Sequence, residues 1–214
     1  ILINMTVRRL KKTVNNWTTL NETINPLKTA PENTTIKLNP GTYTAEGRID
    51  WENRNIILTI DGNGQTINAN QHQAFYIQSG TTVILKNITV TNATKNDGYG
   101  GAIYNRGNLT ITNTTLNNNT ANIGGAIYND YGGTITISNH TTLQYNTANS
   151  GGAIYNGGTI TITNHTTLQH NTATSDGGAI ENWVTITITN HTTLQYNTAT
   201  RYGGAIDNWV GNTI

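Results

Sequence analysis

The sequence predicts an all-β protein: a right-handed parallel β-helix of about seven coils, with three strands in each coil of about 26 residues. The main observation is a repeat, because the letters GGAI begin at residues 100, 124, 151, 177 and 203, which are 24, 27, 26 and 26 residues apart. Each period also contains a Thr-Ile segment such as TITITN at 159–164 and a segment such as LQHN at 168–171. Asn, Gly and Ser separate these segments, and each segment is too short to form a ten-residue helix. Three short extended segments per period are typical of one coil of strands.

The Thr-Ile segment is the clearest strand. Ile135 and Ile137 alternate with threonines in TITISN at 134–139, and this period of two marks a half-buried strand of β-branched residues. One period cannot bury its Ile and Leu side chains, whereas stacked copies can, with each strand pairing in parallel with its counterpart about 4.8 Å away. Crossovers between parallel strands are overwhelmingly right-handed, so we predict a right-handed coil.

Weaker copies of the repeat extend toward the N-terminus. The segments AFYIQSGTTVILKN (74–87), RIDWENRNIILTID (48–61) and TTIKLNPGTYTAEG (34–47) follow the same order of turns and strands. We therefore assign residues 34–214 to the β-helix. Because the sequence stops at GGAIDNWVGNTI, where the next Thr-Ile strand should begin, we expect this β-helix to be truncated at its C-terminal end.

Residues 1–33 are predicted to form an N-terminal tail and a short capping helix. Pro26 limits the helix, which would cover the unpaired strand edges at the end of the stack. The apolar residues at helical spacing are Val14, Trp17, Leu20 and Ile24. A basic cluster precedes them, interpreted as a solvated tail with an acidic polymer partner as the alternative: Arg8, Arg9, Lys11 and Lys12.

Composition restricts the possible partners. Only 11% of the residues are charged, the formal net charge is +1, and no basic stripe for nucleic acid is present. The chain has no Cys, which excludes disulfides and thiolate metal sites, and we expect no metal and no cofactor. No apolar run approaches the roughly 20 residues that span a bilayer, so we expect contact with a membrane only through parts outside this chain.

Asparagine recurs at three positions of the repeat, which predicts ladders of stacked, buried amides at the bends between strands. The first position contains Asn105, Asn129, Asn156, Asn182 and Asn208; the second contains Asn113, Asn139, Asn164 and Asn190; the third contains Asn119, Asn146, Asn171 and Asn197. Several belong to N-x-[ST] sequons, and we expect burial to prevent their glycosylation.

His140, His165 and His191 also recur at one position of the repeat. Zinc binding would need converging imidazoles, so we predict a parallel, exposed ladder instead.

One column of the repeat changes its chemistry along the chain and is expected on an open face. It contains Tyr104, Tyr128, Tyr155, Glu181 and Asp207. Glu181 and Asp207 on adjacent coils have the roughly 5 Å separation of a retaining glycosidase pair, which makes a carbohydrate-active enzyme one alternative. Trp183 and Trp209 form a neighbouring column, which would offer a flat apolar platform to sugar rings or a protein, or would simply cover a corner of the stack.

We therefore select Trp183, Trp209, Tyr155, Glu181 and Asp207 as candidate binding residues, and we select no catalytic residue. The outward threonines of the Thr-Ile strands, such as Thr159 and Thr161, form a regular grid. This grid leaves an ice-binding or structural stalk as a further alternative.

The repeat resembles a known class of surface proteins. GGAIYN (151–156), with segments such as LQYN (143–146), is similar to the GGA[ILV] and F-x-x-N repeat pair of polymorphic membrane proteins, with Leu in place of Phe. It looks still more like the Asn/Thr-rich adhesin-like surface proteins of methanogenic archaea. TIKLNPGTYT (35–44) and TIDGNGQTINAN (59–70) resemble the entry coils of pectate-lyase-like proteins. The resemblance covers about residues 34–210. It implies an extracellular, cell-surface adhesin segment without enzymatic activity, which binds a glycan or protein of another cell or host.

Overall fold

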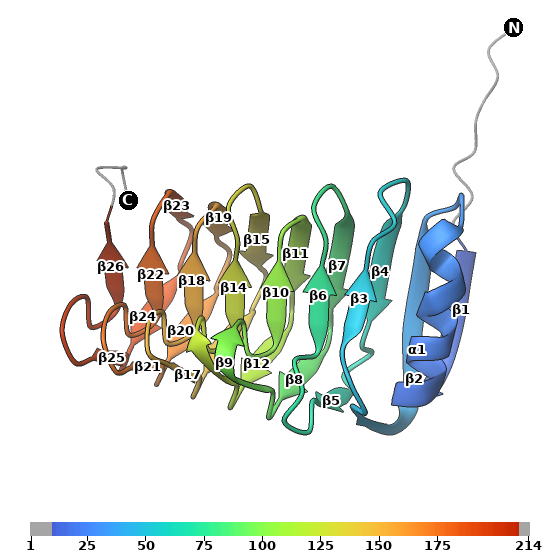
Figure 1. Ribbon diagram of the computed structural model, residues 1–214, viewed down its shortest axis with the longest axis horizontal. Helices are drawn as coiled ribbons and strands as arrows, with labels where there is room; N and C mark the ends of the chain where they lie inside the picture. The colour runs from blue at the N-terminus through green and yellow to red at the C-terminus, as the bar shows by residue number, and fades with distance from the viewer. Residues whose placement is uncertain (1–9, 210–214) are drawn as a thin grey trace, which may run out of the picture.

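The computed structural model describes residues 10–209 and shows an all-β solenoid (Figure 1). It has about eight parallel turns of about 26 residues, stacked along the long axis, with one short helical segment at the N-terminal end. The predicted fold class, repeat length and capping helix are therefore confirmed.

Three strands of each turn build three faces of the stack. The Thr-Ile face consists of β4 (Ile57–Asp61), β7 (Thr82–Lys86), β11 (Asn108–Thr112), β15 (Thr134–Ser138), β19 (Thr159–Ile162) and β23 (Thr185–Ile188). The Leu-Gln face consists of β5 (Thr66–Asn68), β8 (Thr89–Thr91), β12 (Thr115–Asn117), β16 (Thr142–Gln144), β20 (Thr167–Gln169) and β24 (Thr193–Gln195). The Tyr face consists of β3 (Ile49–Trp51), β6 (Phe75–Ile77), β10 (Ile103–Asn105), β14 (Ile127–Asn129), β18 (Ile154–Asn156), β22 (Ile180–Asn182) and β26 (Ile206–Asn208).

A fourth, shorter row of strands closes the turn between the Leu-Gln face and the Tyr face. The sequence repeat did not predict this row, because most of its strands are only a Thr-Ala pair and are too short to show a period. The row consists of β9 (Thr94–Tyr99), β13 (Thr120–Ile123), β17 (Thr147–Ala148), β21 (Thr172–Ala173) and β25 (Thr198–Ala199).

All strand pairings between neighbouring turns of residues 10–209 are parallel, and their register is regular except for shifts in the β1–β2 and β9–β13 pairs. On the Thr-Ile face, Ile137 pairs with Ile162 and Ile162 with Ile188. Ile137 and Ile162 are fully buried, while the threonines that precede them in their strands, Thr136 and Thr161, face outward. This confirms the predicted alternation. The apolar core is thus a set of Ile and Leu columns running through the stack.

The N-terminal segment contributes a turn before residue 34. Strand β1 (Leu10–Asn16) pairs in parallel with β2 (Thr34–Thr44), and β2 in turn pairs with β4 near its start and with β5 at its end. Lys11 and Lys12 therefore belong to a strand rather than to a solvated tail, because the edge of β2 offers backbone groups for pairing. Arg8 and Arg9 lie outside the described residues.

Helix α1 (Trp17–Ile24) covers the end of the stack (Figure 1). Asn16 caps it, since its side-chain oxygen accepts a 2.8 Å hydrogen bond from the Thr19 amide. The 3-10 helix η1 (Asn25–Thr29) follows and contains Pro26, as the sequence predicts for the end of the α-helix. Trp17, Leu20 and Ile24 are buried at the end of the core, whereas Val14, also buried, belongs to β1.

The paired glycines of the repeat have two different roles. Gly151 has a φ of +63°, a conformation that favours glycine. Gly152 is required for a steric reason, because a Cβ at this position would lie only 2.1 Å from the Gly178 carbonyl oxygen of the next turn. The first glycine turns the chain, and the second lets the next turn approach.

Candidate binding face

The variable column of the repeat occupies the middle, outward position of each strand of the Tyr face. Strand register links its members in the order Asp50, Tyr76, Tyr104, Tyr128, Tyr155, Glu181 and Asp207. Sequence comparison found this column only from Tyr104 onward. Asp50 and Tyr76 belong to it as well. Their segments were identified as weaker copies of the repeat, but the column was not extended into them because the GGAI letters are absent there.

Four tyrosines in this column form a continuous ring stack. Centroid distances are 5.0 Å from Tyr76 to Tyr104, 5.0 Å from Tyr104 to Tyr128 and 5.1 Å from Tyr128 to Tyr155. Tyr99 packs against it from β9, 4.7 Å from Tyr128. Burial is the main reason that the pKa values of Tyr128 and Tyr155 rise to about 12. The four stacked tyrosines are half-buried, and the raised pKa values keep the Tyr128 and Tyr155 hydroxyl groups protonated at neutral pH.

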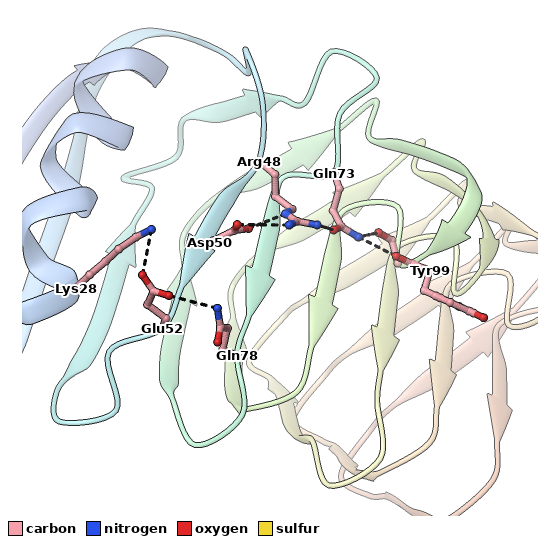
Figure 2. A network of polar contacts seen from close by, with 8 residues as sticks. Lys28, Arg48, Asp50, Glu52, Gln73, Gln78 and Tyr99 are labelled. Carbon is pink, nitrogen blue, oxygen red and sulfur yellow. Dashed lines mark hydrogen bonds and ion pairs between the residues drawn. The ribbon is translucent and has the colours of Figure 1, made fainter.

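Polar contacts hold the N-terminal end of this stack (Figure 2). The Arg48 guanidinium lies 4.7 Å from the centre of the Tyr76 ring and forms a 2.6 Å ion pair with Asp50. Gln73 accepts a hydrogen bond from Arg48 and donates one of 2.7 Å to the Tyr99 carbonyl oxygen, which ties β9 to the same network (Figure 2). The Asp50 carboxylate is therefore already paired with the Arg48 guanidinium.

A second contact chain joins the cap to the first turns. Lys28 of η1 forms a 3.4 Å ion pair with Glu52, which accepts a 3.4 Å hydrogen bond from the Gln78 side chain (Figure 2). In the middle of the face, the Tyr104 hydroxyl donates to Asp130 at 2.8 Å, and Arg106 lies 3.2 Å from the same carboxylate. Asp50, Glu52 and Asp130 on this part of the face are therefore each paired with donors.

At the C-terminal end of the column, a buried glutamate replaces the half-buried tyrosines. Glu181 is only 4% exposed, so the expectation of an open position is wrong for this residue. Its carboxylate accepts a 2.7 Å hydrogen bond from the Trp183 indole nitrogen. Burial raises the pKa of Glu181, and the charges of Asp176 and Asp207 add to this effect, while the contacts with Trp183 and Ser150 oppose it. A bulky indole over a shorter acidic side chain explains why the glutamate lies beneath the surface.

Trp183 and Trp209 stack with a centroid distance of 5.2 Å and an angle of 3° between their planes. Their exposures are 38% and 51%. This is offset stacking, in which each ring covers part of its neighbour. The two indole planes are therefore parallel and partly overlap, so the rings do not lie side by side in one plane. Tyr155 follows in the same row of rings, 6.4 Å from Trp183.

A hollow of about 320 Å³ lies beside the outer indole, lined by Tyr202, Asp207, Asn208 and Trp209. Tyr202 comes from the loop before β26, a residue that sequence analysis did not select. Arg201 lies 5.4 Å from the centre of the Tyr202 ring and forms a 3.2 Å ion pair with Asp176. The structure thus brings Glu181, Asp207 and both tryptophans to one end of the Tyr face.

Two of the three predicted asparagine ladders are confirmed. Asn156 donates to Asn182 at 2.6 Å in the first, and Asn146 donates to Asn171 at 3.0 Å in the third, and both sets are buried apart from their ends. The second set is different, because Asn113, Asn139, Asn164 and Asn190 are exposed. They have positive φ values of 47° to 53° at tight corners, so the predicted burial of these sequons is wrong. The backbone conformation favours asparagine there, and within this exposed set Asn190 still donates a 3.5 Å hydrogen bond to Asn164.

The histidine ladder has the predicted parallel geometry. The rings of His140, His165 and His191 stack with centroid distances of 5.1 and 4.9 Å and angles of 10° and 12°. Within residues 10–209, no three His, Cys, Asp or Glu side chains are grouped as ligands for a metal ion. The threonine grid also keeps its register, with Thr161 paired to Thr136 and Thr187.

Comparison with known proteins finds one family. Residues 113–130 and 140–157 match the model of the Chlamydia polymorphic membrane protein repeat, which covers less than half of the chain. No curated protein and no solved structure matches. No helix among the described residues is long and apolar enough to cross a membrane. The match fits the repeat seen in the solenoid and points to a surface-exposed repeat protein.

Proposed function

We propose that this chain is a non-enzymatic, extracellular segment of a cell-surface adhesin, and that its Tyr face binds a glycan or surface protein of another cell or host. The observation that carries the proposal is the exposed Trp183–Trp209 pair beside the hollow, on a solenoid with repeats like those of polymorphic membrane proteins.

Exposed indoles favour binding for a physical reason. Each offers a large apolar surface at low cost in conformational entropy, and tryptophan and tyrosine are enriched among the residues that dominate binding energy. On this face they adjoin Asp207 and Asn208, which can form hydrogen bonds with hydroxyl or amide groups. An apolar surface with a few polar groups at its edge suits sugar rings and protein side chains alike.

The test is adhesion of the intact chain to a glycan array and to whole cells. The double variant Trp183→Ala/Trp209→Ala should lose most of the binding, because both exposed rings are removed. Tyr196→Ala is the matched control: this aromatic is 71% exposed and lies at the corner after the Leu-Gln face. Equal binding by the double variant and the wild type, with both folded by circular dichroism, would contradict the proposal.

A carbohydrate-active enzyme is the second candidate, because Glu181 pairs in register with Asp207 and its pKa is raised, as a general acid requires. Incubation of the wild type with a panel of oligosaccharides tests it. Release of products that disappears with Glu181→Gln would favour this candidate, and the absence of products from the wild type would contradict it.

A further inference from the structure

The corner between the Thr-Ile face and the Leu-Gln face presents a row of exposed asparagines, here called the Asn corner. Its members directly follow the Thr-Ile segments, and each begins an N-x-[ST] sequon: Asn113, Asn139, Asn164 and Asn190. They are stacked turn on turn, since the Asn113 backbone amide donates to the Asn139 carbonyl oxygen at 2.9 Å. An exposed sequon in a turn is the setting in which asparagine accepts a sugar in surface proteins.

The buried asparagines have no sequons. Eight asparagines among residues 10–209 are buried, and none is followed by Ser or Thr two positions later: Asn53, Asn105, Asn119, Asn129, Asn146, Asn156, Asn171 and Asn182. Asn119, Asn146 and Asn171 come close, because Thr follows each directly, but Ala occupies the next position. Every sequon asparagine in the described range is exposed or partly exposed. Burial and the sequon thus exclude one another in a chain rich in both Asn and Thr.

Asn164 has the side-chain amide best placed to carry a sugar. Its oxygen accepts hydrogen bonds from the Thr163 hydroxyl at 3.3 Å and from the Asn190 amide nitrogen at 3.5 Å. Its own Nδ2 donates to no group among residues 10–209, so a sugar on this nitrogen displaces no hydrogen bond. Asn113 differs, because its Nδ2 donates to the Asn87 side chain at 2.8 Å. Attachment at Asn164 therefore leaves the contacts of the corner intact.

The Asn corner does not border the candidate binding face. In one turn the chain passes along β18 of the Tyr face, then β19 of the Thr-Ile face, and reaches Asn164 before β20 of the Leu-Gln face. The corner therefore joins the two faces other than the Tyr face. Sugars attached there would extend from the side of the solenoid that lacks Trp183 and Trp209, and would leave both indoles open to a partner.

We propose that the Asn corner is a site of N-linked glycosylation, with Asn164 as its preferred acceptor. The inference goes beyond the proposed binding function and shares with it only the extracellular location. The donor is an oligosaccharide joined through phosphate to a lipid, and an oligosaccharyltransferase of the producing cell performs the transfer. Nδ2 of Asn164 forms a bond to C1 of the first sugar, while the bond from C1 to the phosphate oxygen breaks. The lipid phosphate leaves, and the amide gives up one proton.

The folded turn sets the time of this transfer. Thr166, the last residue of the sequon, is buried, and its hydroxyl donates a 2.7 Å hydrogen bond to the Thr163 carbonyl oxygen. An enzyme that reads the whole sequon must therefore act before this turn folds. Afterwards the exposed Asn164 side chain holds the sugar in solvent, and the core is undisturbed.

The experiment is glycopeptide mass spectrometry of the chain isolated from the surface of the cells that produce it. We expect the peptide containing Asn164 to carry added sugar mass, which fragmentation removes as sugar units, and Asn164 to be the most occupied member of the Asn corner. Asn164→Gln and Thr166→Val, expressed in the same cells, should both lose this sugar, because each destroys the sequon.

The variants have matched controls. Thr166→Ser keeps the hydroxyl and the sequon, so it should keep the sugar. Asn149→Gln changes an exposed asparagine that lies outside any sequon, and it should leave the sugar content unchanged. If Asn164→Gln fails to fold because of the φ of 53° at this position, site mapping of the wild type and of Thr166→Ser still decides.

Three results would overturn the inference: an Asn164 peptide found only without sugar, sugar confined to Asn16 and Asn21 near helix α1, or sugar retained on Asn164 in Thr166→Val. Adhesion of the wild type to cells and to the glycan array is measured in parallel. Adhesion by a chain without sugar at the Asn corner would defeat this inference and leave the proposed function standing. Sugar on Asn164 in a chain that does not adhere would do the reverse.

Discussion

Trp183 donates a 2.7 Å hydrogen bond through its indole nitrogen to the Glu181 carboxylate, two residues earlier in the same turn. One indole therefore covers the acid, satisfies one of its oxygens and stacks on Trp209 of the following turn. A buried glutamate, an exposed ring and the contact between two turns thus depend on one another.

The stability of the chain should fall with rising pH because of Glu181. Its pKa is raised in the folded state by burial and by Asp176 and Asp207, so the folded protein binds this proton more tightly than the unfolded chain. This contribution is fully present below the ordinary pKa of about 4.3 and is lost as pH rises through the higher folded value. Urea unfolding from pH 4 to pH 7 should show the decline, and Glu181→Gln should flatten it.

The control for that experiment is Asp97→Asn. Lys95 holds the pKa of Asp97 below its ordinary value, so this group titrates at lower pH and should leave the slope between pH 5 and pH 7 unchanged. A glutamine variant with the same slope as the wild type would show that Glu181 does not cause the pH dependence.

Ile162→Asp should unfold several turns. Ile162 is fully buried and continues the column of Ile137 and Ile188, so a carboxylate there would have no partner and would cost several kcal/mol. Far-UV circular dichroism and the melting temperature test this. Thr159→Asp, an exposed position on the same strand, should behave like the wild type, and equal melting of both variants would contradict the inward position of Ile162.

Asn156→Ala should destabilise the chain by about 1–3 kcal/mol or more. The Asn156 side chain donates to Asn182 and accepts from Asn129, so its removal leaves the buried Asn182 side-chain oxygen without this donor and takes one of its three acceptors from Asn129. Asn164→Gly at an exposed corner with a φ of 53° should change the free energy of unfolding by less than about 1 kcal/mol. Equal losses in the two variants, measured by denaturant unfolding, would count against the ladder as a source of stability.

Gly152→Ala should also be strongly destabilising. The added methyl group would lie 2.1 Å from the Gly178 carbonyl oxygen, so neighbouring turns would have to separate. Gly47→Ala is the control, since nothing lies within 4 Å of a Cβ there. A melting temperature for Gly152→Ala equal to that of the control would show that turns can move apart freely.

The period of the sequence was sufficient to predict the solenoid, since stacking identical segments is the simplest way to bury Ile137, Ile162 and their equivalents. It could not predict β1, because a strand that pairs with a non-repeated neighbour has no copy for comparison. The period also could not distinguish a buried asparagine such as Asn156 from an exposed one such as Asn164, since both recur equally well. Glu181 was placed in the right column at the wrong depth, because its burial depends on contact with Trp183.

The parallel pairing has a mechanical consequence. The backbone and asparagine hydrogen bonds between turns point along the long axis, so a tensile load on the two ends would act on them one turn at a time. Each turn that peels away would release about 26 residues, or roughly 85 Å of extended chain. Such a protein would lengthen in steps under load, and the turns still stacked would keep their surface.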